Sequence, residues 1–268
     1  MDPLQETEAI QQFMKLLEEN GRQGQAADLS ALMWYMDGMN RQYEAVLTEL
    51  QALKEQLSQE KRPSVKYVIQ RAVAKLEHKT HQIKDVLDSL WEKVAQCAAD
   101  AVRDFKEMGV SALDKSASAL GVKKALEALQ EGISGLVADT RKSIEKVEHM
   151  GHDLRSAGAH LKNAGRAMLG KEPQVVNDGQ EGRFQSVLLA PMRTTQRLLI
   201  GMNNATLAAI GSTEHLEQRA SEVRDARAER AAAGKPSIRQ DLEEKKAQVV
   251  AQSVPAPDRS HKPPEAER

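Results

Sequence analysis

The chain has 268 residues, of which 40% are hydrophobic, 29% are charged and only 3% are aromatic. This composition is too apolar for a wholly disordered chain and too poor in aromatic side chains for an ordinary globular core. Ala, Leu, Glu, Gln, Lys and Arg dominate, which favours long helices. We therefore predict an all-α fold in which long amphipathic helices form an elongated helical bundle or coiled coil, followed by a disordered C-terminal tail.

The formal net charge of −1 hides an uneven distribution. Residues 1–60 contain four basic against eleven acidic residues, a balance of −7, whereas residues 61–170 contain nineteen basic against fourteen acidic residues, a balance of +5. Either the acidic part packs on the basic part, or both are solvated surfaces, and the second interpretation is favoured. The sequence shows neither a signal peptide nor an apolar window of about 20 residues that would span a membrane, so we expect a cytoplasmic protein.

The N-terminal 60 residues predict a helical hairpin, with helices over residues 4–19 and 26–59. In the second helix, apolar residues alternate in steps of three and four over four heptads, which is typical of a coiled coil. The pattern predicts an interaction seam formed by Leu29, Leu32, Met36, Met39, Tyr43, Val46, Leu50, Leu53 and Leu57. It does not distinguish a seam within the chain from a seam with a copy of the chain or with another helical protein.

Residues 64–170 predict long central helices, the first of which runs from Ser64, as a capping residue, to about Met108. Farther along, Gly151, Gly158 and Gly165 recur every seven residues and are our candidates for close packing. A glycine destabilises a helix by about 1 kcal/mol. Three glycines at this spacing therefore indicate either the close approach of another backbone or a weak helix that becomes ordered on binding.

The C-terminal third begins with residues 171–183, which predict a linker and the best candidate for a domain boundary. Residues 184–232 predict a helix with a possible kink at Pro191 and an uncharged stretch, residues 198–213, that something should bury. Past Glu214 the helix is densely charged, which is typical of a solvated helix. Residues 237–250 predict a short helix, and residues 251–268 predict a disordered tail.

No arrangement of residues in the sequence indicates catalysis, so we predict no enzyme activity, no cofactor and no small-molecule substrate. Residues 165–172 resemble a phosphate-binding loop, but Glu172 stands where Ser or Thr would bind magnesium, and a helix precedes the segment instead of a strand. A helix that ends at Gly170 explains the same residues. Cys97 lies on an apolar stripe, where we expect a small buried side chain and not a nucleophile.

Two pairs of histidines lie one helical turn apart: His78 with His81, and His149 with His152. Neither pair has the additional Cys or carboxylate spacing of a zinc site, so we predict no metal site. Two functions stay open. The first is a non-enzymatic helical scaffold for protein–protein interaction. The alternative is a peripheral membrane- or DNA-associated adaptor that uses the basic, small-residue-rich helix 111–170, although this helix lacks aromatic anchors.

Several segments of the N-terminal third are distinctive, among them Leu-Glu-Glu-Asn-Gly at residues 17–21 and the segments at 27–29, 33–39, 43–47 and 49–50. They resemble an uncharacterised family of helical proteins from gut Gram-positive bacteria, often encoded near conjugative-transfer genes. Residues 235–242 also resemble a short C-terminal helix of proteins on such elements. The resemblance implies an accessory protein of a bacterial mobile element, and it implies neither an activity nor catalytic residues.

Overall fold

The computed structural model describes residues 7–113, 121–174 and 183–233, and these residues contain helices and no strand. The helices are α1 (Glu8–Glu19), α2 (Gln23–Ser58), α3 (Pro63–Met108), α5 (Lys123–Met168) and α6 (Arg183–Ala233). The prediction of an all-α fold is confirmed. Contacts divide the chain into two compact units, Met1–Ser221 and Glu222–Arg268. Residues 171–183, predicted as a linker, therefore join two helices of the first unit.

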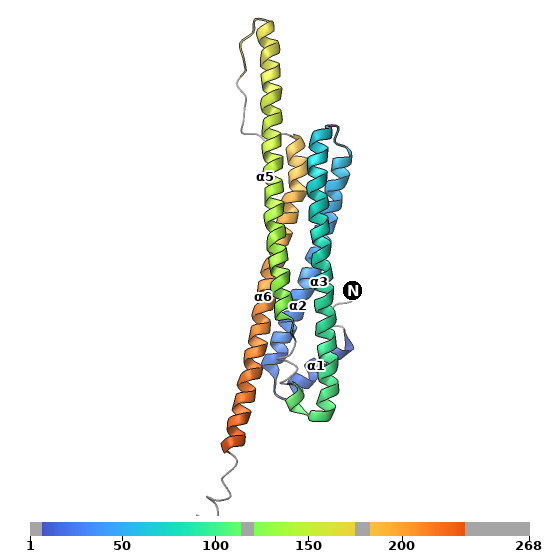
Figure 1. The fold of residues 1–268 in the computed structure, drawn as a ribbon, viewed down its shortest axis with the longest axis vertical. Coiled ribbons are helices and arrows are strands. Elements are labelled where there is room, and N and C mark those ends of the chain that lie inside the picture. The colour runs from blue at the N-terminus through green and yellow to red at the C-terminus, as the bar shows by residue number, and fades with distance from the viewer. Residues whose placement is uncertain (1–6, 114–120, 175–182, 234–268) are drawn as a thin grey trace, which may run out of the picture. The chain divides into compact units, whose positions relative to one another are not determined.

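In the first unit, α2 and α3 form an antiparallel pair, α5 packs along α3, and α1 contacts both α2 and α3 (Figure 1). α6 runs beside α5 and α2. An Arg193 guanidinium nitrogen lies 2.8 Å from a carboxylate oxygen of Glu148 on α5, and Thr206 Oγ1 lies 3.0 Å from Met39 Sδ on α2. Each helix contributes a stripe of apolar side chains to one shared core, so the unit is a helical bundle.

The predicted interaction seam of α2 lies in the core of the chain itself. All of its residues are at most 3% exposed. Two polar contacts hold α2 against α3: Tyr43 Oη lies 3.2 Å from His81 Nδ1, and Lys54 Nζ lies 2.6 Å from a carboxylate oxygen of Glu77. Of the arrangements that the sequence left open, the structure contains the one within the chain, because α3 supplies a matching apolar stripe in the same molecule.

The ends of the helices follow short-range signals. α1 ends where the Asn20 side chain donates a 2.8 Å hydrogen bond to the Leu16 carbonyl oxygen, and Gly21 then takes a φ of +74°, which residues with a Cβ rarely adopt. α3 begins at Pro63, one residue before the predicted start, because the fixed φ and missing N–H of proline suit the first helical position. α3 then continues unbroken to Met108, as predicted.

The uncharged stretch of α6 is buried on one side only. Met202, Thr206 and Ala209 are at most 1% exposed, as we expected for this stretch. Ile200 and Leu207 lie outside the core and are 43% and 49% exposed. The prediction that something buries residues 198–213 is therefore confirmed for the inner face. For the outer face it stays a prediction, since a helix in a bundle has neighbours within the chain on only part of its circumference.

The second unit contributes the last turns of α6 to the described residues. Residues 222–230 are exposed apart from the half-buried Val223, which confirms the prediction of a solvated, charged helix. Pro191, the predicted kink position, lies inside α6 in the first unit. The predicted helix 237–250 and the predicted tail 251–268 lie outside the described residues.

The substitution Leu50→Ala should lower the free energy of unfolding by about 2–5 kcal/mol, because it leaves a cavity in a packed core. Leu50 is 2% exposed. Leu161→Ala removes the same atoms from a side chain that is 78% exposed and should change the stability by about 0.5 kcal/mol or less. Urea unfolding at low protein concentration, followed by circular dichroism, measures both values. Equal losses would contradict the assignment of Leu50 to the core.

Candidate interaction surfaces

The core stripe of α5 continues beyond the core. Its apolar and small residues follow one another in steps of three and four, and the stripe is buried at Leu126, Leu129, Ile133, Leu136, Thr140, Ile144, Val147 and Gly151. The same spacing then continues through Leu154, Gly158, Leu161, Gly165 and Met168. Of these, Leu154, Leu161 and Met168 are 37%, 78% and 91% exposed. We call these three residues the α5 row. No other described helix runs beside this end of α5 (Figure 1).

Gln185, near the start of α6, marks the end of the buried part of the stripe. Its side chain is 3% exposed and lies against Gly151, whose missing Cβ leaves room for it. Gln185 Nε2 donates a 2.8 Å hydrogen bond to the Glu148 carbonyl oxygen, and Gln185 Oε1 accepts one from Arg155. The close packing predicted at Gly151 is therefore present, but a side chain approaches the glycine and not a second backbone.

The other two glycines of the repeat have no such neighbour. A Cβ at Gly158 or Gly165 would meet no atom of the described residues within 4 Å, and both glycines are exposed. The described part of the chain therefore supplies no close packing there, because the side chain that covers Gly151 comes from the first turn of α6 and no described helix lies beyond it. Close packing of Gly158 and Gly165 against another chain stays a prediction.

Basic side chains flank the α5 row. Residues 151–171 contain one carboxylate, that of Asp153, against Arg155, Lys162, Arg166 and Lys171. Residues 171–174 fold back along one flank of α5. There the Asn163 side chain exchanges hydrogen bonds with the backbone of Gln174, and Arg166 Nε donates one to the Glu172 carbonyl oxygen at 2.8 Å. These contacts occupy the polar flank and leave the α5 row exposed.

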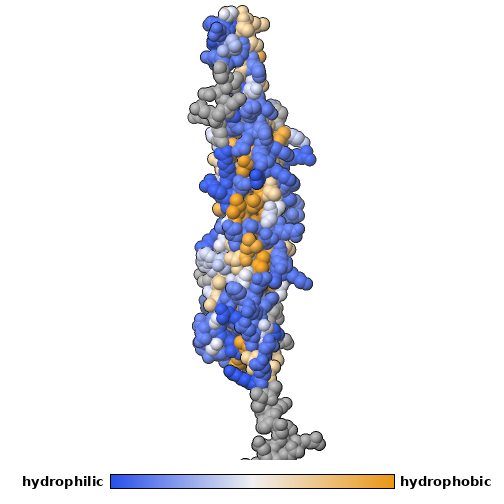
Figure 2. Space-filling view, turned by 90° about the vertical axis from the view of Figure 1, so that its left-hand side faces the viewer, coloured by the Kyte–Doolittle hydropathy of each residue, from blue (hydrophilic) through white to orange (hydrophobic). Residues whose placement is uncertain are grey.

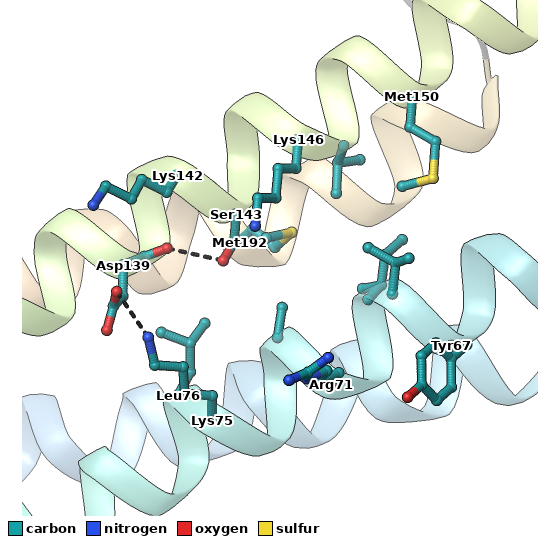
Figure 3. Close-up of a pocket in the computed structure, with 14 residues that line it drawn as sticks. Tyr67, Arg71, Lys75, Leu76, Asp139, Lys142, Ser143, Lys146, Met150 and Met192 are labelled. Atoms are coloured by element: carbon teal, nitrogen blue, oxygen red, sulfur yellow. Dashed lines mark hydrogen bonds and ion pairs between the residues drawn. The ribbon is translucent and has the colours of Figure 1, made fainter.

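A second surface is a groove of about 740 Å³ between the first half of α3 and the middle of α5. We call it the basic groove and define it by Tyr67, Val68, Arg71, Lys75, Asp139, Lys142, Lys146, Val147, Met150 and Met192. Figure 3 shows that α3 and α5 approach each other at Lys75 and Asp139 and lie farther apart toward Tyr67 and Met150. The groove is therefore closed at one end and open at the other.

Asp139 closes the narrow end of the basic groove. Its carboxylate oxygens lie 3.2 Å from Lys75 Nζ and 2.7 Å from Lys79 Nζ. These ammonium groups, and above all the hydrogen bond from Lys79, hold the pKa of the Asp139 carboxyl below its usual value. Arg71, Lys142 and Lys146 have no carboxylate partner among the described residues. The groove therefore carries an excess of positive charge.

The sequence did not lead us to the basic groove. Tyr67 and Val68, which are 65% and 43% exposed, lie beside the buried stripe residues Val65 and Ile69. Apolar residues outside the heptad stripe of α3 were the signal that could have indicated a second contact surface. Figure 2 shows a face of the molecule on which hydrophilic side chains dominate and apolar surface gathers in patches near the middle.

The segment that resembles a phosphate-binding loop has the geometry of a helix end. Gly170 takes a φ of +67°, and the Lys171 N–H donates a 2.9 Å hydrogen bond to the Arg166 carbonyl oxygen. Cys97 is half-buried, and burial followed by the nearby Asp100 carboxylate raises the pKa of its thiol, which disfavours the reactive thiolate.

Metal sites and membrane-spanning helices are absent from the described residues. No group of three or more His, Cys, Asp and Glu side chains in this part of the chain is placed to hold a metal ion. None of the described helices combines the length and the apolar character needed to cross a membrane. The α5 row and the basic groove are the two candidate interaction surfaces.

A comparison with models of protein families matches residues 6–262 to a family of unknown function, DUF6674. The match covers nearly the whole chain, including the part between the N-terminal segments and residues 235–242 in which the resemblance was noted. No curated protein and no solved structure matches the chain.

We expect Gly151→Ala and Gly158→Ala to have opposite effects on stability. At Gly151 the new methyl group displaces the buried Gln185 side chain from its hydrogen bonds, and the free energy of unfolding should fall by about 1 kcal/mol or more. At Gly158 the methyl group meets open space, and the higher helix propensity of Ala should raise stability by up to about 1 kcal/mol. Thermal unfolding of the two variants measures both changes in stability. A more stable Gly151→Ala variant would contradict the packing of Gln185 against Gly151.

The stabilising contribution of Asp139 should depend on pH. Because its folded-state pKa is lowered, the contribution is present above the unfolded-state value of about 3.8 and is lost as the pH falls through the lowered folded-state pKa. We therefore expect Asp139→Asn to cost about 1 kcal/mol or less at pH 7, because both lysines are partly exposed, and to cost less at pH 2. Urea unfolding of both proteins at the two pH values measures this. A difference in the free energy of unfolding between the two proteins that is as large at pH 2 as at pH 7 would contradict the contribution of the ion pairs.

Proposed function

Since the chain belongs to the DUF6674 family, whose function is unknown, we propose from its surfaces that it is a non-enzymatic helical scaffold that assembles through the α5 row with a second copy of itself. One observation carries the proposal: the stripe that packs α5 into the core continues, with the same spacing, onto the exposed end of the helix. An exposed apolar row of this kind on a helix marks an interaction surface.

A second copy fits the α5 row sterically. Because small and large residues alternate along this stripe, two copies can be aligned antiparallel so that small residues of one stripe face large residues of the other. A single alignment places Leu161 of the second copy opposite Gly158, and Leu154 of the second copy opposite Gly165. The open space at both glycines then receives a leucine side chain, as in closely packed helix pairs. The exposed end of α5 is self-complementary in shape.

The charges beside the α5 row oppose this pairing. The same alignment brings Arg155 of one copy near Lys162 of the other, and like charges at such positions are destabilising. The interface is also short, since residues 151–168 span about 27 Å of helix. We therefore expect a weak dimer that forms at high protein concentration. Salt screens the repulsion, so the dimer should strengthen as the salt concentration rises.

Light scattering across a range of protein concentrations tests the assembly. We expect a mass that rises toward that of a dimer, more so at about 500 mM than at about 50 mM salt. Leu161→Lys should leave a monomer, because it replaces an apolar contact by a further positive charge in the pairing surface. Leu207→Lys is the matched control, since Leu207 is also exposed, at 49%, but lies on α6. A wild-type protein that is monomeric at every concentration and salt would remove the self-assembly proposal.

A second candidate function is a surface adaptor that binds anionic lipid or DNA through residues 111–170. In the structure the helix of this segment is α5, which begins at Lys123 and not at residue 111. The observation in its favour is the basic flank of α5 next to exposed Leu161, Met168 and Leu169, a combination found in helices that lie on membranes. This candidate makes the opposite prediction about salt, because binding to phosphates weakens as salt increases. A monomeric protein that sediments with anionic vesicles at low salt would favour it over the scaffold.

The resemblance noted in the sequence extends the proposal to a biological setting. We propose that the chain is an accessory protein of a bacterial mobile element, acting beside proteins of the conjugation machinery. Deletion of the gene from such an element, followed by measurement of transfer frequency, tests this part of the proposal separately from the assembly of the purified protein.

A further inference from the structure

We infer that the basic groove is a docking site for an acidic amphipathic helix of another protein. This inference does not depend on pairing at the α5 row, because the two surfaces consist of different residues. It rests on the shape of the groove, on its apolar floor and on its uncompensated positive charge.

The shape suits a short helix. The lining residues run from Tyr67 to Leu76 on α3 and from Asp139 to Met150 on α5, about three helical turns on each side. The volume of about 740 Å³ accommodates several side chains of a helix that lies in the groove, and not the helix as a whole. The ion pair between Lys75 and Asp139 closes one end, so the guest helix enters from the end of Tyr67 and Met150 (Figure 3).

The floor of the groove is apolar and adaptable. Met150 from α5 and Met192 from α6 line it together with Val147, and methionine side chains repack around different partners. Tyr67 and Val68 stand exposed at the open end. An exposed tyrosine beside aliphatic and methionine side chains is typical of grooves that take the apolar face of a helix.

The basic side chains that line the groove favour an acidic helix as the binding partner. Arg71, Lys142 and Lys146 lack carboxylate partners among the described residues, and Lys75 shares Asp139 with Lys79. A helix with an apolar face and flanking glutamates would pack on the apolar residues of the groove and form ion pairs with its basic residues. A nucleic acid duplex would contact the lysines through its phosphates but would leave Tyr67 and Val68 without an apolar partner, and the flat surface of a bilayer does not reach the floor of a groove.

Fluorescence anisotropy with designed peptides and the full chain tests the inference. The probe is a labelled peptide of about four turns, with Leu at spacings of three and four and Glu on both flanks. The control peptide has the same composition in scrambled order. We expect saturable binding of the probe only, weakened about tenfold or more by Lys142→Glu combined with Lys146→Glu. Lys162→Glu combined with Arg166→Glu changes the same helix by the same charge outside the groove and should have little effect.

Reversing the charges on both the peptide and the groove makes the test stricter. A peptide with Lys in place of Glu should fail to bind the wild-type chain and should bind the variant with Lys142→Glu and Lys146→Glu. Equal binding of the scrambled peptide, no saturable binding of the probe up to about 1 mM, or equal loss in the control variant would each overturn the inference. So would single-stranded DNA or anionic vesicles that bind more tightly than the peptide and lose binding on the same two substitutions. Leu161→Lys should leave peptide binding unchanged, which separates this site from the α5 row.

Discussion

Each helix of the first unit is held by one narrow apolar stripe that must face the stripes of its neighbours. With only 3% aromatic residues, the chain has few large side chains that could bridge wider gaps, so neighbouring helices have to lie in contact wherever their stripes form the core. Where a neighbouring helix is present, as for α2 against α3, the stripe is buried within the chain. Where the neighbour ends, as beyond Gly151 on α5, the stripe is left open to solvent. The fold and its candidate surfaces therefore have the same origin.

The helices themselves could be predicted well from the sequence, because the signals that define them are local. Steps of three and four identified α2 and its buried residues, and Asn20 with Gly21 marked the end of α1. The location of the partner stripe could not be predicted, because a heptad pattern specifies an apolar face and not which helix covers it. Long α3 shows a second limit: Cys97, which we expected to be buried, is half-buried, and its neighbour Ala98 is buried.

The candidate surfaces were less predictable, because they depend on where distant helices begin and end. Gly151, Gly158 and Gly165 look equivalent in the sequence, yet only Gly151 lies within reach of Gln185. The basic groove combines residues about 75 positions apart in the chain, and it exists because α3 and α5 lie farther apart beyond the ion pair of Asp139 with Lys75. The lysines of α5 were recognised as a basic set, but without α3 they indicated only a diffuse surface.

The polar contacts of α5 have a consequence for its register. A heptad stripe repeats every seven residues, so apolar packing alone scarcely distinguishes the observed position of α5 from one that has slipped along its axis by about 10 Å. Such a slip would bring either Gly132 or Lys146 to the place of Asp139, opposite Lys75 and Lys79, and would separate Ser134 Oγ from Asn203 Oδ1, now 2.9 Å apart. These side chains therefore select one alignment among near-equivalent ones. They thereby determine how many turns of α5 stand clear of the bundle.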